Sequence, residues 1–174
     1  MIAARAELYE PFQMTFTPTP ARFAQLYEQH YEAVFRAALR VTGNGADAED
    51  VLQTVFLRVL SRNDEEEAAR RPVAYFRRAA VNAAVDLLRR RAAHGETAYD
   101  EGAPHAAVEP ALLLKEQLRR AVATLDSEDA ELFLLRHVEG LSNQDLADEF
   151  QLEKNNVAVR LHRIRARLQS EMQR

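Results

Sequence analysis

Apolar residues recur every three to four positions in two stretches of the first half of the chain, at 23–41 and 48–60. This spacing places them on one face of a helix, so both stretches predict amphipathic helices. Gly43-Asn44-Gly45 separates the two stretches, and glycine after a periodic stretch is a common stop signal for a helix. The first half of the chain therefore begins with two helices joined by a short turn.

A third helix is predicted after a polar loop, Ser61–Arg71. Pro72 suits the first turn of a helix, because its missing N–H would have no partner there. The apolar positions that follow keep the helical spacing and are expected to be buried: Val73, Phe76, Ala80, Ala83 and Leu87. Three helices with short connections form a small bundle, which we predict as one domain over residues 21–93.

Four shorter helices are predicted over residues 111–174. Asp126 or Ser127 can cap the second, and Ser142 with Asp145 forms a capping-box pattern at the start of the third, residues 143–150. Asn155 or Asn156 is expected to cap the last helix. The predicted fold is all-α, with two small helical domains.

The segments outside these two domains differ from them in composition. Residues 1–20 contain three prolines and no sustained period, so we expect a loose N-terminal leader. Residues 94–110 hold glycines, prolines and acids, which predicts a flexible linker spanning roughly 20–25 Å. Such a linker would let the two domains move relative to each other.

The second domain has the anatomy of a helix-turn-helix over residues 142–168. A short capped helix carries the small Ala147, a turn carries the apolar Leu152, and a longer helix follows. Because Val157, Leu161 and Ile164 turn inward, four side chains face outward and are expected to reach base edges in a major groove: Ala158, Val159, His162 and Arg163. Flanking arginines are expected to contact phosphates: Arg160, Arg165 and Arg167. A plain helical hairpin with a basic exterior is the alternative.

The net charge of −4, taken alone, argues against a protein that binds nucleic acid. The distribution of charge argues the other way. Residues 70–91 hold seven arginines against one acid, and residues 154–174 hold six basic residues against one acid. Local basic faces determine the attraction to a polyanion more than net charge does. The sequence therefore predicts one basic surface in each domain.

Several other classes of protein lack support in the sequence. There is no cysteine, which excludes disulfides and thiolate metal sites. The five histidines show no metal spacing, no glycine-rich phosphate loop is present, and no nucleophile lies beside an evident base. We therefore expect no enzyme, no metal and no cofactor. No segment approaches the roughly 20 apolar residues of a membrane span, and no signal-peptide core is visible, so the expected location is the cytoplasm.

Four segments together resemble RNA polymerase sigma factors of the extracytoplasmic-function (ECF) subfamily: 47–58, 75–91, 135–142 and 156–168. The resemblance covers about residues 20–172. It implies a protein that binds core RNA polymerase and directs promoter recognition and transcription initiation through sequence-specific DNA binding. It also implies an anti-sigma factor as a further partner, and the lack of cysteine excludes direct sensing of thiol oxidation.

The resemblance assigns roles to residues of the first domain, sigma region 2. The outer face of its second helix would bind the clamp helices of the largest polymerase subunit through Asp50, Gln53, Thr54 and Leu57. Thr54 stands where the family usually has an acid. The third helix would read the minus-10 element, with Asn82 beside a base taken out of the stack. One stripe of that helix would hold the DNA: Tyr75, Arg78, Asn82 and Arg89.

The second domain, sigma region 4, would read the double-stranded minus-35 element. The family commonly has threonine where Asn156 stands and a polar or basic pair at positions 158 and 159. We therefore expect base discrimination to rest on His162 and Arg163, with Val159 contacting a thymine methyl. A stand-alone helix-turn-helix regulator is the rival hypothesis. It would explain the second domain equally well but leaves the pattern of residues 47–91 unexplained.

Overall fold

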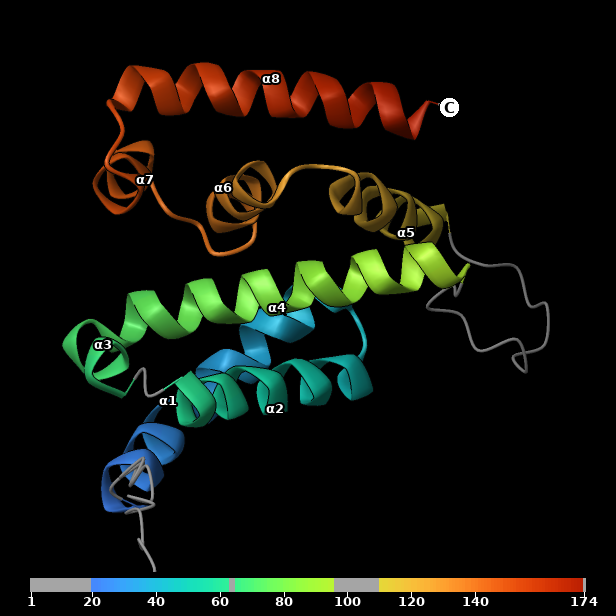
Figure 1. The fold of residues 1–174 in the computed structure, drawn as a ribbon. Helices are drawn as coiled ribbons and strands as arrows, with labels where there is room; N and C mark the ends of the chain where they lie inside the picture. The colour runs from blue at the N-terminus through green and yellow to red at the C-terminus, as the bar shows by residue number, and fades with distance from the viewer. Residues whose placement is uncertain (1–19, 63–64, 96–109, 174) are drawn as a thin grey trace, which may run out of the picture.

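The computed structural model of this 174-residue chain describes residues 20–62, 65–95 and 110–173. All regular structure in these ranges is helical, which confirms the predicted all-α class (Figure 1). The leader and most of the predicted linker lie outside the described residues. The helices are α1 Pro20–Thr42, α2 Gly45–Arg62, α3 Glu65–Arg70, α4 Pro72–His94, α5 Pro110–Ala123, α6 Ser127–His137, α7 Asn143–Phe150 and α8 Lys154–Met172.

The first domain is built around α4, which packs against both α1 and α2. Its largest fully buried side chains come from all three helices: Val34, Val51, Val55, Val59, Phe76, Val81 and Val85. The predicted buried positions of α4 are confirmed apart from Val73, which lies in the first turn and is 67% exposed. Pro72 occupies the first turn as predicted, and α1 ends at Thr42, before Gly43 with φ +70°.

The segment predicted as a polar loop, Ser61–Arg71, contains the short helix α3. This difference has a physical reason. Its sequence Glu-Glu-Glu-Ala-Ala-Arg consists of strong helix formers, and the side chain of Ala68 is fully buried in the first domain. Tertiary contact at Ala68 thus stabilises a helix too short to form alone.

The second domain follows the predicted capping pattern at two helix starts. The Asp126 side chain accepts a hydrogen bond from the Asp129 N–H at 2.9 Å, and Ser142 and Asp145 form a full capping box. The prediction for α8 was wrong in detail. That helix begins at Lys154, and its N-cap is Glu153, which makes no side-chain capping bond.

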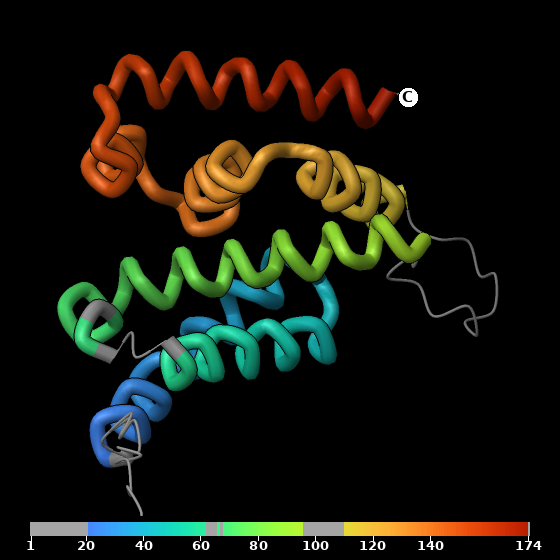
Figure 2. The backbone as a smooth tube through the Cα atoms, viewed as in Figure 1, coloured from blue at the N-terminus to red at the C-terminus, as the bar shows by residue number. Residues whose placement is uncertain are grey.

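The helix α4 is covered on two opposite sides, by α1 and α2 of its own domain and by the second domain. Figure 1 shows α4 in the middle, α1 and α2 below it, and the second domain above it with α8 outermost. The chain path in Figure 2 follows the same layers. Both α5 and α6 contact α4, and the buried side chains form one apolar cluster across the two domains. In the structure the two domains are packed together, whereas the linker composition predicted domains that can move relative to each other.

No helix in the described part of the chain is long and apolar enough to cross a membrane.

Leu146 tests the packing of the second domain, because its side chain is fully buried. We expect Leu146→Ala to lower the free energy of unfolding by about 2–5 kcal/mol, since it removes buried methyl groups and leaves a cavity. Val73→Ala, at an exposed position, should change the stability by no more than about 0.5 kcal/mol. Urea unfolding followed by circular dichroism measures both, and equal losses for the two variants would contradict this assignment of the core.

Candidate nucleic-acid interface

The helix-turn-helix is held together by its turn. Gln151 adopts a left-handed conformation with φ +55°, and the next N–H, of Leu152, donates to the carbonyl of Ala147 at 2.9 Å. Ala147 is buried, so α7 and α8 can approach closely, and Leu152 packs against the core below them. The turn therefore fixes the orientation of α8 relative to α7.

The inner side of α8 is buried, as predicted, through Val157, Leu161, Ile164 and Leu168. Its outer side leaves Ala158, Val159, His162 and Arg163 exposed. A shallow groove of about 590 Å³ runs along this side and is lined by residues that include Asn156, Val159, Arg163 and Arg167. The predicted base-reading side chains are therefore accessible, and their roles remain a prediction.

The flanking arginines of α8 differ in what they contact. The half-buried Arg160 binds the start of α6, with 2.5 Å to Asp129 Oδ1 and 2.9 Å to Glu128 Oε2. The guanidinium is therefore already bound by carboxylates in the structure, and the predicted contact of Arg160 with a phosphate stays a prediction. Arg165 and Arg167 are exposed, although Arg167 also donates to the Thr124 carbonyl at 3.0 Å.

The predicted minus-10 stripe borders a basic groove of about 760 Å³ on α4. Asn82 is half-buried there and is not enclosed in the apolar core. The first domain supplies most of the lining, including the polar side chains Arg58, Arg70, Arg71, Tyr75, Arg78 and Asn82. The second domain supplies Glu149 and Gln151. An amide thus lies among four guanidinium groups, with one carboxylate of the other domain beside them.

Two arginines of the stripe are bound to the second domain, which the sequence did not predict. Arg78 forms an ion pair with Glu131, and its guanidinium lies 4.9 Å from the ring centre of Phe150. Arg89 donates to the Leu125 carbonyl at 2.7 Å and to the Ser127 hydroxyl at 3.0 Å. This side of α4 therefore faces the second domain in the structure.

The predicted polymerase face on α2 is open. Asp50, Gln53 and Leu57 are exposed, and the Leu57 side chain is 62% exposed. The Thr54 hydroxyl donates to the Asp50 carbonyl within the same helix at 2.8 Å. The outward face is a mixture of acidic, amide and apolar groups.

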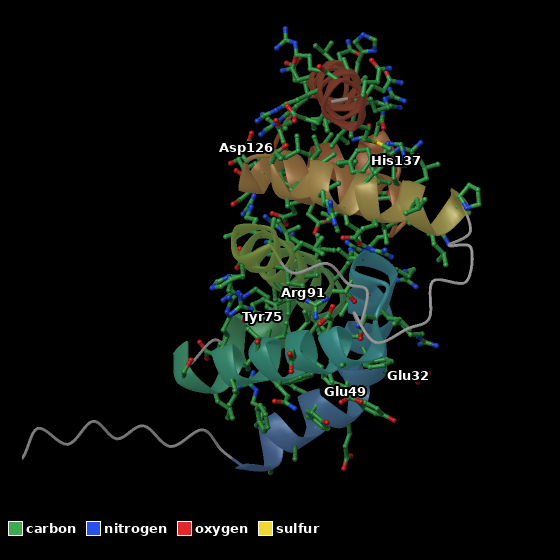
Figure 3. The ribbon with its side chains drawn as sticks, turned by 90° about the vertical axis from the view of Figure 1, so that its right-hand side faces the viewer. Glu32, Glu49, Tyr75, Arg91, Asp126 and His137 are labelled. Carbon is green, nitrogen blue, oxygen red and sulfur yellow. The ribbon has the colours of Figure 1, made fainter. Side chains whose placement is uncertain are left out.

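The start of α2 shows two contacts that the sequence analysis did not predict. Asn44 caps this helix by accepting a hydrogen bond from the Ala46 N–H at 2.8 Å. Asp47, in the first turn of α2, is buried and forms an ion pair with Arg91 at the far end of α4. Burial raises the pKa of Asp47, and the cation of Arg91 opposes this. Figure 3 labels Arg91 between α4 and α2, within the first domain.

Comparison with known families matches both domains. Sigma-70 region 2 matches residues 26–94, and Sigma-70 region 4 matches residues 115–168. The chain belongs to the sigma-70 family. It is a sigma factor of the ECF type, which acts with core RNA polymerase at promoter DNA in transcription initiation. The region 2 match accounts for residues that a stand-alone regulator leaves unexplained, so that alternative is not favoured.

Individual relatives are distant but cover most of the chain. The RNA polymerase sigma-E factor of Streptomyces coelicolor is 28% identical over 153 residues, covering 86% of this chain and 85% of the relative. CarQ of Myxococcus xanthus is 29% identical, covering 81% and 83%. Among solved structures, RpoE of Bartonella quintana in complex with the anti-sigma factor NepR is 19% identical, with a TM-score of 0.47, and covers 87% of this chain and 96% of that one.

Asp126 should make the stability of this sigma factor depend on pH. The hydrogen bond from the Asp129 N–H is the main cause that lowers the pKa of the Asp126 carboxyl. A carboxyl whose pKa is lower in the folded chain stabilises the fold above its unfolded pKa, and this contribution is lost as the pH falls through the folded pKa. Asparagine keeps a capping oxygen and does not titrate.

We therefore expect the parent to be more stable than Asp126→Asn at pH 7, and the difference to close between about pH 5 and pH 2. Chemical unfolding of both proteins across this range measures the difference at each pH. A difference that persists unchanged at the acid end would show that the carboxylate charge at this cap does not stabilise the fold.

Proposed function

We propose that this sigma factor reads the minus-10 element with the basic groove on α4. The observation that carries the proposal is the position of Asn82 among Arg58, Arg70, Arg71 and Arg78. The amide can donate to and accept from one base edge, and the guanidinium groups can bind the phosphates of a melted strand. Tyr75 offers an aromatic ring on which a base can stack.

In the same proposal, α8 reads the minus-35 element in the major groove. Val159 and Arg163 line one groove on the exposed side of α8. His162, which precedes Arg163, is also exposed. Arginine can bind guanine through two hydrogen bonds, and valine can contact a thymine methyl. Arg165 and Arg167 would contact phosphates, and Arg160 would do so in exchange for its contacts with Glu128 and Asp129.

Core polymerase would bind the exposed face of α2, with Asp50, Gln53 and Leu57 against the clamp helices of the largest subunit. A partly apolar helix face of this kind suits helix-on-helix docking. The protein contributes recognition in this proposal and no catalysis. An anti-sigma factor that covers these faces is a further proposed partner, on the strength of family resemblance alone. Run-off transcription with core polymerase on genomic fragments tests the whole assignment.

Leu57 tests the polymerase face. We expect Leu57→Asp to weaken association with core polymerase about tenfold, because it places a charge in an apolar contact, equivalent to about 1.4 kcal/mol. Leu113→Asp is the matched control, since Leu113 is similarly exposed at 49% but lies on α5. Titration of labelled sigma factor with core polymerase measures both affinities. Equal weakening by the two substitutions would remove α2 as the docking face.

Arg163 tests the reading of the minus-35 element. We expect Arg163→Ala to lose about 1–3 kcal/mol of binding free energy at one promoter position and to relax the preference there. Arg165→Ala should instead weaken binding to all sequences alike and reduce the dependence on salt. Competition binding of holoenzyme to a set of single-base promoter variants distinguishes these patterns. A uniform loss for Arg163→Ala would make it a phosphate contact.

A further inference from the structure

The N-terminal half of α1 presents an aromatic strip, which consists of Phe23, Tyr27 and Tyr31. These residues follow one another at steps of four, so they lie on one side of the helix about 6 Å apart. The ring centres of Tyr27 and Tyr31 are 5.6 Å apart and stacked, and those of Phe23 and Tyr27 are 6.4 Å apart. Tyr27 and Tyr31 are nevertheless 40% and 44% exposed. Stacked rings at the surface form a larger apolar patch than a single exposed side chain does.

The aromatic strip borders the proposed polymerase face on α2. Phe56 of α2 joins the two surfaces, because its ring centre lies 4.8 Å from that of Tyr27 and 6.1 Å from that of Phe23. Leu57 follows Phe56 in the chain, and Gln53 precedes it by about one turn of the helix. A segment that packed on the strip would therefore lie beside Gln53 and Leu57.

Residues 12–17 of the leader carry a pattern that matches the strip. Their sequence, Phe-Gln-Met-Thr-Phe-Thr, alternates apolar and polar residues. In an extended chain, alternate residues point to the same side and lie about 6.6 Å apart. Phe12, Met14 and Phe16 would therefore form one apolar edge, whose spacing is close to that of the three rings of the strip. A segment this short is not stable in isolation, so it needs a surface on which to pack.

The apolar edge of the leader is close enough to reach the strip. The structure describes α1 from Pro20, which is four residues after Phe16 and eight after Phe12. Four extended residues span at most about 13 Å, and eight span at most about 26 Å. The far end of the strip, Tyr31, lies about 16 Å from Pro20 along the helix. A reversal of the chain before α1 would thus set the apolar edge against the strip.

We propose that residues 12–16 fold back onto the aromatic strip of α1 and compete with core polymerase for the adjoining face of α2. The contact joins aromatic and thioether groups, which attract one another beyond the effect of the area that they bury. A tether of a few residues keeps the local concentration of the segment in the millimolar range, so a weak contact suffices. The competition rests on the proposed docking of polymerase at α2, whereas the contact itself does not.

A single tryptophan can report the contact, because the chain contains no tryptophan of its own. Phe16→Trp in the full chain places the reporter in the apolar edge. Its emission wavelength and its quenching by acrylamide measure how far the indole is buried. The reference is a synthetic peptide of residues 1–19 with the same substitution, which lacks the strip. We expect blue-shifted emission and about threefold weaker quenching in the full chain, because a packed indole is shielded from solutes.

Substitutions in the strip distinguish it from other exposed apolar surfaces. Tyr27→Ser with Tyr31→Ser should return the emission and quenching of the reporter to those of the peptide. The matched control is Leu113→Ser with Leu114→Ser, which removes two side chains of α5 that are 49% and 56% exposed. This control should leave the reporter unchanged. Circular dichroism checks that both variants keep their helices.

Titration of the labelled full chain with core polymerase measures the competition. The leader variant replaces the apolar edge by serine: Phe12→Ser, Met14→Ser and Phe16→Ser. Its matched control replaces the polar positions of the same segment: Gln13→Ser, Thr15→Ser and Thr17→Ser. A leader that is docked in about four-fifths of the molecules lowers the apparent affinity for polymerase about fivefold. We therefore expect the leader variant to bind about fivefold more tightly than the parent, and the control to stay within about twofold of it.

The contact would be overturned by equal quenching in the full chain and the peptide, or by release of the reporter in the α5 control as readily as in the strip variant. A buried reporter together with equal polymerase affinity for the leader variant and its control would overturn the competition. Failure of the proposed docking on α2 would be seen separately, as a Leu57→Asp variant that binds polymerase as tightly as the parent does.

Discussion

The packing of α4 on two sides is the constraint from which the rest of the structure follows. Alanines at positions 80 and 84 are fully buried in it, and small side chains let neighbouring helices approach closely. Phe76 and Val81 add fully buried bulk in the same helix. An ordinary surface helix has one apolar stripe, whereas α4 is covered by α1 and α2 on one side and by α5 and α6 on the other. Its remaining surface is where the arginines lie.

Several acids of this acidic chain are enclosed in ion pairs. Asp47, Glu131 and Glu149 are each largely enclosed and bound to an arginine of α4. Each pair takes up one acid and one arginine, so the remaining charges still sum to −4, and a basic surface arises only where exposed arginines gather. Exposed arginines such as Arg163 face an approaching polyanion. An intact pair of this kind adds little net stability. Removing one partner leaves a buried charge without a partner, which destabilises the fold. These pairs therefore specify which surfaces meet more than how stable the chain is.

The sequence predicted features that depend on near neighbours. The capping box at Ser142, the cap at Asp126 and the stop at Gly43 each involve residues no more than four positions apart, and the structure confirms them. The inner and outer sides of α8 were predictable for the same reason, since helical spacing alone decides them. Family resemblance supplied the roles assigned to Asn82 and to the face of α2, which stay predictions.

What the sequence did not predict depends on distant contacts. Arg78 and Glu131 are 53 positions apart, and no local pattern links them. Arg160 looked like its neighbours on α8, and only the placement of α6 shows that it binds Asp129. The composition of the linker predicted domains that move independently. Composition indicates how flexible a linker is, but it contains no information on whether the surfaces of the two domains pack together. The helix α3 was missed because its six residues are too few to show a helical period, and it is stabilised by the burial of one side chain, Ala68.

Arg78 shows how one side chain can be described by the structure and by the proposed function in different terms. Its guanidinium has a carboxylate partner and an aromatic face in the second domain, Glu131 and Phe150. In the proposed function the same group binds a phosphate of a melted strand. A guanidinium is a donor only, so the carboxylate and the phosphate call on the same N–H groups. The contact of Arg78 with Glu131 thus explains the packing of the two domains, and its contact with DNA stays a prediction.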